Sequence, residues 1–212
     1  MFELPASPKQ ILEKHTHLIT LFPGLSEQEL DRFRKRLGGY LPAEINELLI
    51  YSTGFIYAQE RAICFTGHED FAFEEAFPCS IAVLPDGLGN FWVVDINKED
   101  GAWGPVFYVC HDPAVVVVQA PELASFLLQV LQPLEGVPKN ALDYVSKKAA
   151  FTIWRQDPWL MPYNDPRIPQ DPLVSDFAKQ LLQNCRIADL RRKEIGSGFR
   201  WGASRGTAQI WD

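Results

Sequence analysis

Few residues in this sequence have the types and spacing that metal binding or catalysis requires. The segment 86–90 (DGLGN), with Asp95 close behind it, offers carboxylate and amide oxygens that could bind a hard cation. A calcium loop of this kind needs more carboxylates and a closing glutamate, and the segment lacks them. We therefore interpret it as a hairpin loop in which the glycines adopt positive φ angles while Asp86 and Asn90 bond the turn backbone.

The adjacent residues His111 and Asp112 are a second candidate for a metal centre, as in metal-dependent phosphohydrolases. Such a centre needs further histidines and acids, and the three other histidines lie far from this pair in the sequence. There is no GxSxG motif, and the segment 196–198 (GSG) lacks the lysine and the preceding strand of a phosphate loop, so we interpret it as a flexible joint. We predict no catalytic residue, no metal site and no cofactor; an enzyme with an unrecognised active site remains a third alternative.

Charge is distributed unevenly along the chain. Residues 1–140 contain 19 acidic and 9 basic side chains, a net charge of −10, whereas residues 141–212 contain 8 acidic and 11 basic ones, a net charge of +3. Phosphate binding requires a basic surface, so nucleic acid is not expected as a ligand of residues 1–132. A basic protein partner fits the negative charge, and an acidic surface that only keeps the chain in solution is the alternative.

The densest acidic segment surrounds two phenylalanines, Phe71 and Phe73. Its acidic residues are Glu69, Asp70, Glu74 and Glu75. If the two rings are exposed, the segment combines a charged rim with apolar contact residues, as protein interfaces do. The alternative is a short amphipathic helix that places both rings and Phe77 in the core.

The first part of the chain has the pattern of a helical layer. Apolar residues recur at helical spacing over residues 8–22. A second helix is predicted to start at Ser26, with Glu29 completing a capping box, and to end at Gly38. A third helix is predicted from Pro42 onward. The chain therefore opens with helices.

Strands follow from Phe55 onward, where short β-branched and aromatic runs alternate with turn residues. The predicted strands lie near residues 55–65, 80–84, 91–96, 105–110 and 114–119. Strand 91–96 (FWVVDI) is apolar on both faces, which indicates a central position, and short turns favour antiparallel pairing. Asp95, late in this strand, either caps backbone donors or lies on a functional surface. With a further helix after Pro121, the fold class is α+β, with a central antiparallel-rich mixed sheet flanked by helices.

The last third of the chain is predicted to be a helical extension. Residues 140–154 are helical in pattern, residues 157–172 contain five prolines and are predicted to be irregular, and another helix starts at Asp171. A basic tail with interleaved aromatic residues follows. It could bind nucleic acid by phosphate pairing and base stacking, or dock on the acidic part of this chain or of a second copy.

Composition indicates a globular chain. It has 212 residues, of which 47% are hydrophobic, enough for one sizeable core. Its start lacks the features of a signal peptide, and no run of apolar residues is long enough for a membrane helix, so we expect a cytoplasmic protein. The four cysteines are irregularly spaced and are expected to be buried reduced thiols.

Several motifs together resemble one protein family. They are the segments 41–44 (LPAE), 86–90 (DGLGN), 91–96 (FWVVDI) and 104–112 (GPVFYVCHD), and a final helix containing residues 125–127 (SFL). In order and spacing, they are similar to the SUKH superfamily, which comprises relatives of the yeast Smi/Knr cell-wall synthesis regulator and many bacterial immunity proteins. The resemblance covers about residues 25–132. It implies a compact α+β fold, a role in binding a protein partner, and no catalytic residues.

Two functions follow as expectations from this resemblance. The first is a bacterial immunity protein that neutralises a cognate toxin, often a basic one, by stoichiometric binding; the second is a regulatory or scaffold protein of the Smi/Knr type. We expect a SUKH-like domain at residues 1–132 and an extension at residues 133–212, and self-association stays open. The predicted partner-binding residues are Glu69, Asp70, Glu74, Glu75, Asp86, Asn90, Asp95 and Asp112.

Overall fold

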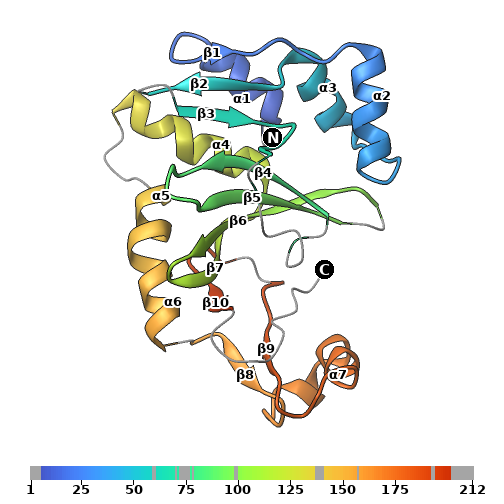
Figure 1. The fold of residues 1–212 in the computed structure, drawn as a ribbon, viewed down its shortest axis with the longest axis vertical. Helices are drawn as coiled ribbons and strands as arrows, with labels where there is room; N and C mark the ends of the chain where they lie inside the picture. Colours follow the sequence, from blue (N-terminus) through green and yellow to red (C-terminus); the bar gives the residue numbers. More distant parts are fainter. Residues whose placement is uncertain are drawn as a thin grey trace, which may run out of the picture.

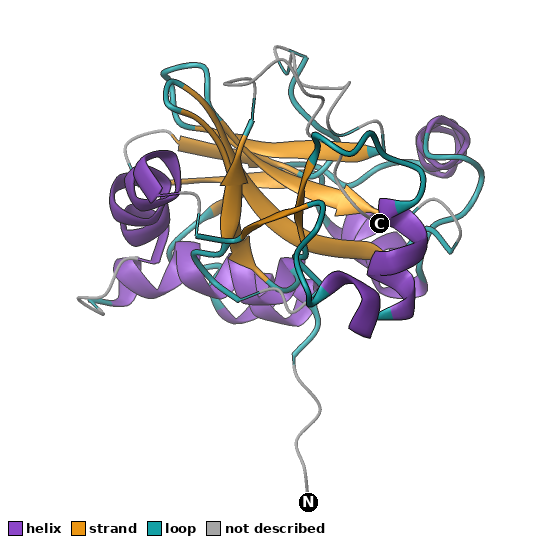
Figure 2. Ribbon diagram, turned by 90° about the horizontal axis from the view of Figure 1, so that it is seen from below, coloured by secondary structure: helices purple, strands orange, loops and turns teal. Residues whose placement is uncertain are grey.

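The chain folds as an α+β protein, as predicted (Figure 1). The computed structural model describes residues 6–58, 61–69, 71, 77, 79–97, 100–136, 141–156, 158–191 and 194–201. Within these ranges, five strands form an antiparallel sheet and three short strands form a second one. Figure 2 shows most of the helices gathered on one side of the strands. No helix in the described ranges has the length and apolar content needed to cross a membrane.

The opening helices are α1 (Pro8–Lys14), α2 (Glu27–Arg36) and α3 (Ala43–Tyr51). The capping box of Ser26 and Glu29 forms as predicted. The prediction of one helix over residues 8–22 is wrong in length. After Lys14 the chain turns into the short strand β1 (Thr20–Leu21), and the ring of His15 bonds the carbonyl of Ile11 at 2.6 Å. Apolar residues of this turn enter the same core as the helix, so the sequence pattern continues where the helix does not.

A three-stranded sheet packs beside these helices in the order β1-β2-β3. Strands β2 (Gly54–Tyr57) and β3 (Arg61–Cys64) form an antiparallel hairpin where one strand over residues 55–65 was predicted. That prediction is wrong, and the reason is local. The polar residues Gln59, Glu60 and Arg61 separate two apolar runs in the sequence, and the prediction did not use that break; the buried Phe55 and Ile63 place both strands in the same core.

The central sheet has the order β10-β7-β6-β5-β4 and is antiparallel throughout. Its strands are β4 (Ser80–Pro85), β5 (Phe91–Ile96), β6 (Trp103–His111), β7 (Ala114–Ala120) and β10 (Gly198–Arg200). Strand β5 pairs on both sides, which confirms its predicted interior position. The segment 196–198 is not a flexible joint, because it leads into β10, which pairs with β7. A strand of three residues leaves too short a pattern to be recognised in the sequence.

Two hydrophobic clusters cover the two faces of the central sheet. One face packs against α1, α3, α4 (Leu123–Leu131) and a continuous helical segment formed by α5 (Ala141–Asp143), η2 (Tyr144–Ala149) and α6 (Ala150–Gln156). The other face carries a largely aromatic cluster to which Phe71, Phe77 and Phe199 belong. Phe71 and Phe77 are therefore core residues and not exposed contact residues, while Phe73 lies outside the described residues. None of the four cysteines forms a disulfide; Cys110 is buried as predicted, whereas Cys64, Cys79 and Cys185 are only half-buried.

The extension continues into a small lobe below the sheet (Figure 1). The extension begins with η1 (Gln132–Glu135), before the helical segment. The elements of the lobe are β8 (Leu160–Pro162), η3 (Ile168–Gln170), α7 (Pro172–Ala178) and β9 (Arg186–Ala188). Strands β8 and β9 pair with each other, and a separate core forms around Met161 and Ile187. Asp171 caps α7 as predicted, by accepting hydrogen bonds from two backbone N–H groups.

An arginine joins the two ends of this lobe. Arg191 donates to Asp189 through Nε and Nη2, at 2.8 and 2.6 Å, and to Asp171 Oδ2 at 2.6 Å. These hydrogen bonds hold the pKa values of both carboxyl groups below their usual range. Arg191, at the start of the basic tail, is thus bound to two acids of the extension.

Replacing Arg191 by alanine is expected to raise amide hydrogen exchange in α7 several-fold at neutral pH, because the cap Asp171 loses its tether. Carboxyl groups whose pKa is lowered by folding stabilise the fold above their unfolded pKa of about 4, and this stabilisation is lost as the pH falls through the lower folded values. Acidification should therefore loosen α7 in the wild type more than in the variant. Lys179→Ala, which removes an exposed pair with Asp176 in the same lobe, is the control. Equal amide exchange of α7 in the Arg191→Ala and Lys179→Ala variants would contradict the claim that the hydrogen bonds of Arg191 to Asp171 stabilise this helix.

Candidate functional site

The loop between β4 and β5 is held by its own side chains. Asp86 Oδ1 accepts from the backbone N–H groups of Leu88 (2.7 Å) and Asn90 (3.1 Å), and Asp86 Oδ2 accepts from Asn90 Nδ2 at 2.6 Å. Gly87 and Gly89 adopt φ angles of 84° and 85°, a region that favours glycine. This confirms the predicted hairpin interpretation of the DGLGN segment. Among the described residues there is no group of three side chains suited to hold a metal ion.

The neighbouring turn between β6 and β7 is bonded to this loop. Asn90 Oδ1 accepts from the backbone N–H of His111 at 3.0 Å and lies 2.8 Å from its ring Nδ1. Tyr108 donates its hydroxyl hydrogen to Asp86 Oδ2 at 3.3 Å, and burial raises the pKa of Tyr108, so the hydroxyl stays protonated. The His111 ring also lies against Gly89, where a Cβ atom would come within 3.2 Å of Cε1. The two turns therefore form one rigid unit.

This unit presents an apolar side chain with acids beside it. Leu88, at the tip of the loop, is 76% exposed, and Asp112 is exposed on the adjoining turn. Asn90, one of the predicted partner-binding residues, is only 5% exposed, and its amide is hydrogen-bonded to Asp86 and to His111 within the unit. We call this unit the hairpin surface; it comprises Asp86, Leu88, Asn90, His111 and Asp112. A contact residue on a pre-formed loop loses little conformational freedom on binding, which favours affinity.

The other predicted residues lie elsewhere. Asp95 is half-buried near the end of β5, opposite Ser80 at the start of β4, and Glu69 is exposed in the segment before β4. The hairpin surface lies at the opposite end of β4, and because a strand rises about 3.3 Å per residue, this six-residue strand places the two ends roughly 20 Å apart. Asp70, Glu74 and Glu75 lie outside the described residues. The predicted site thus divides between two ends of the β4–β5 hairpin.

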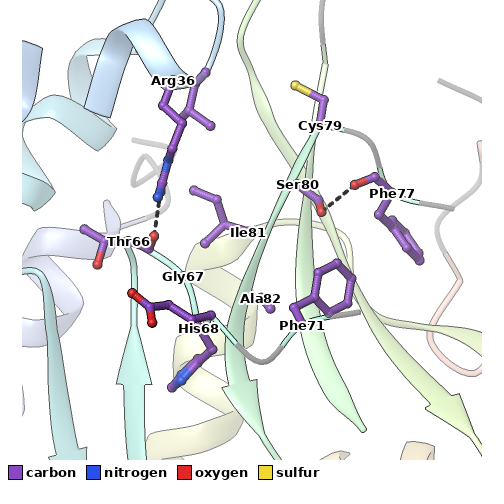
Figure 3. Close-up of a pocket in the computed structure, with 12 residues that line it drawn as sticks. Arg36, Thr66, Gly67, His68, Phe71, Phe77, Cys79, Ser80, Ile81 and Ala82 are labelled. Atoms are coloured by element: carbon purple, nitrogen blue, oxygen red, sulfur yellow. Dashed lines mark hydrogen bonds between the residues drawn. The ribbon is translucent and has the colours of Figure 1, made fainter. Parts of the chain in front are cut away.

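Glu69 is one of the residues that line a pocket of about 440 Å³. Figure 3 shows this pocket with Arg36, His68 and Ser80 in its wall. Arg36 lines it from the end of α2, and its guanidinium donates to the carbonyl of Thr66 at 2.6 Å while lying 4.8 Å from the centre of the Phe33 ring. Ser80 donates to the carbonyl of Phe77 at 2.9 Å, also within the pocket wall. These two polar groups already have partners within the chain, and the lining carries both a base and an acid. Its chemistry therefore does not indicate one class of small ligand.

Sequence reasoning missed three members or supports of the hairpin surface: Leu88, Tyr108 and His111. One signal was available for Leu88. An apolar residue between two glycines in a tight turn has little chance to pack back onto its own hairpin, so its exposure could have been predicted. The roles of Tyr108 and His111 depend on bonds to residues about 20 positions away in the chain, which no local pattern reveals.

The geometry defines an α+β protein in which one end of an antiparallel sheet carries a pre-formed loop surface. The sequence model of the SMI1 / KNR4 family (SUKH-1) matches residues 24–129, half of the 212-residue chain, and the chain belongs to this family. This confirms the resemblance identified in the sequence. Proteins of the family typically bind protein partners and are generally non-catalytic. No curated protein and no solved structure matches the chain significantly.

Proposed function

We propose that this protein is an immunity protein that neutralises a cognate toxin by stoichiometric binding, with the hairpin surface as the contact. The observation that carries the proposal is the exposed Leu88 on a rigid loop with Asp86 and Asp112 beside it. Toxins that act on nucleic acid are often basic. An acidic surface on residues 1–140 accelerates encounter with such a toxin and suppresses other partners, while an apolar contact residue slows dissociation.

Where the neighbouring gene encodes a toxin domain, binding of that domain to this protein, measured by calorimetry, tests the proposal. The wild type is expected to bind with one-to-one stoichiometry. Leu88→Ser should weaken binding at least about tenfold, which corresponds to about 1.4 kcal/mol. Asp112→Lys should lower the association rate and weaken its salt dependence, both measured by stopped-flow fluorescence, because it inverts one charge at the rim of a surface that stays acidic.

Two controls place the contact. Leu182→Ser and Asp176→Lys change an exposed leucine and an exposed acid in the C-terminal lobe and should leave affinity unchanged. Glu69→Lys tests the pocket end of the hairpin. If only Glu69→Lys reduces affinity, the toxin contacts the pocket and not the hairpin surface. If none of the substitutions reduces affinity, the proposal that the toxin contacts this acidic surface is wrong.

Neutralisation itself is tested by growth. Expression of the toxin domain in a heterologous host should arrest growth, co-expression of this chain should restore it, and the Leu88→Ser variant should restore it poorly.

The alternative, a regulatory or scaffold protein of the Smi/Knr type, is favoured by one observation. The chain continues beyond the matched residues 24–129 into an extension that joins the central sheet. Absence of a toxin gene beside this one, together with a non-toxic binding partner, would support that alternative.

A further inference from the structure

The helical segment 141–156 has an outer face that is unusually aromatic. Its inner face packs on β7 and β10 and buries five apolar side chains: Leu142, Val145, Ala149, Ala150 and Ile153. The outward side chains Tyr144, Phe151 and Trp154 are between 41% and 48% exposed. Ile195, in the loop that leads to β10, is exposed as well. Scattered exposed apolar residues are normal, but a group of this kind on one element marks an interaction site.

These side chains are held in place before any partner arrives. The rings of Phe151 and Trp154 pack edge to face, with centroids 6.3 Å apart and planes at 81°. The Tyr144 ring lies against Gly196, where a Cβ atom would be 3.2 Å from the ring Cε1 and hydroxyl oxygen. Arg200 of β10 donates to the carbonyl of Trp154 at 3.4 Å. The aromatic groups therefore stand on a backbone fixed to the sheet, and ordering them costs little on binding.

The same surface is cationic in a chain with a net charge of −7. Lys147, Lys148 and Arg155 are exposed on the helical segment. Its acid, Asp143, pairs with Lys147 at 3.0 Å. Counting the helical segment together with the described residues 194–201, four basic side chains face two acidic ones, because Arg200 and Glu194 add one of each sign. A partner that complements this surface is therefore negatively charged.

The chemistry of the apolar residues distinguishes between anionic partners. Single-stranded nucleic acid binds by stacking bases on open aromatic faces. The ring planes of Phe151 and Trp154 stand at 81° to each other, so two successive bases of one stack cannot lie flat on both rings. Ile195 has no ring on which a base could stack. Trp, Tyr and Phe together with an arginine, here Arg155, are instead the residue types enriched in protein interfaces.

We propose that this face, which we call the extension face (Tyr144, Lys147, Lys148, Phe151, Trp154 and Ile195), binds an acidic polypeptide segment that carries apolar side chains. The segment's carboxylates pair with Lys148 and, in place of its exposed pair with Asp143, with Lys147, and its apolar side chains pack on Phe151 and Trp154. The extension face is formed by different elements from the hairpin surface and has the opposite charge. It therefore serves a second partner, whether or not the hairpin surface binds a toxin.

Fluorescence anisotropy with two labelled peptides tests this proposal on the full-length protein. One peptide consists of glutamate and leucine, and its counterpart of lysine and leucine. The acidic peptide is expected to bind saturably and more weakly as salt increases. The paired substitutions Lys147→Glu with Lys148→Glu, and separately Phe151→Ala with Trp154→Ala, should each weaken binding at least about tenfold. Lys179→Glu and Leu182→Ser, at exposed positions of the C-terminal lobe, should leave binding unchanged.

If the paired substitutions Phe151→Ala and Trp154→Ala alter folding, the paired substitutions Lys147→Glu and Lys148→Glu still test the proposal, because both lysines are exposed. Three results would overturn the proposal. The first is that the acidic peptide does not bind, or binds no better than the basic one. The second is tighter binding of polyuridylate RNA or of phosphatidylglycerol vesicles that the same substitutions abolish. The third is a dimer of the wild-type chain, seen in sedimentation, that these substitutions dissociate.

Discussion

Replacing Gly198 by alanine is expected to detach β10 from the central sheet. A Cβ atom at this position would overlap the carbonyl oxygen of Val116 and lie 2.9 Å from the Cα atom of Val117. Both are backbone atoms of β7, the strand with which β10 pairs, so they cannot move aside as a side chain would. The variant must give up the pairing at this point or displace β7.

The expected cost is large because Phe199 would leave the aromatic cluster with the strand. Phe199 is buried, and truncating a buried phenylalanine to alanine typically costs about 3–5 kcal/mol. Urea unfolding should show a loss of this order for Gly198→Ala. Gly104→Ala is the matched control in the same sheet, since its Cβ atom would meet only the carbonyl oxygen of Asp95, at an ordinary 3.4 Å. Equal stability of the two variants would show that β10 contributes little to the sheet.

This variant also tests the predicted division into a domain at residues 1–132 and an extension at residues 133–212. If the extension is a separate unit, losing β10 should leave the unfolding of the first unit unchanged. If the pairing of β10 with β7 joins them into one cooperative structure, a single transition should move to lower urea concentration. Binding at the extension face should then weaken too, because Gly196, just before β10, lies against Tyr144, and Arg200, the last residue of β10, donates to the carbonyl of Trp154.

Asn90→Ala is expected to separate the two turns of the hairpin surface. The buried amide of Asn90 accepts from the backbone of His111 and donates to the carboxylate of Asp86, so it joins both turns at one point. Removing it leaves polar groups without partners, at about 1–3 kcal/mol for each that stays buried. We expect a total loss of about 2–4 kcal/mol, part of it offset where water reaches the exposed turns.

The consequence for binding should exceed the consequence for stability. Without Asn90 the loop no longer presents Leu88 in one position, and binding of the proposed toxin partner should weaken at least as much as in Leu88→Ser. Amide exchange of residues 87–90 and calorimetry measure the two effects. Asp100→Ala is the control, because it removes a single exposed turn bond to the N–H of Ala102. Unchanged loop exchange in Asn90→Ala would mean that the hairpin surface is rigid for another reason.

Sequence patterns predicted the elements whose signals are local. The Ser26–Glu29 capping box, the apolar face of α4 and the doubly buried strand β5 all depend on residues within a few positions of one another. Such short-range preferences act before the chain is folded, so the sequence expresses them directly. The bonds within the loop 86–90 belong to this group, because Asp86 meets backbone donors only two and four residues further on.

The sequence by itself thus determined the fold class, most helix starts, the hairpin loop and the family. The tertiary structure alone decided that Asn90 meets His111 across 21 positions, that β10 completes the sheet, that Phe71 is buried, and that the predicted acids divide between two ends of β4. The physical reason is the range of the interactions. A cap or a turn is stabilised by its own neighbours, whereas a cross-strand bond or a shared core forms only when distant segments have been brought together.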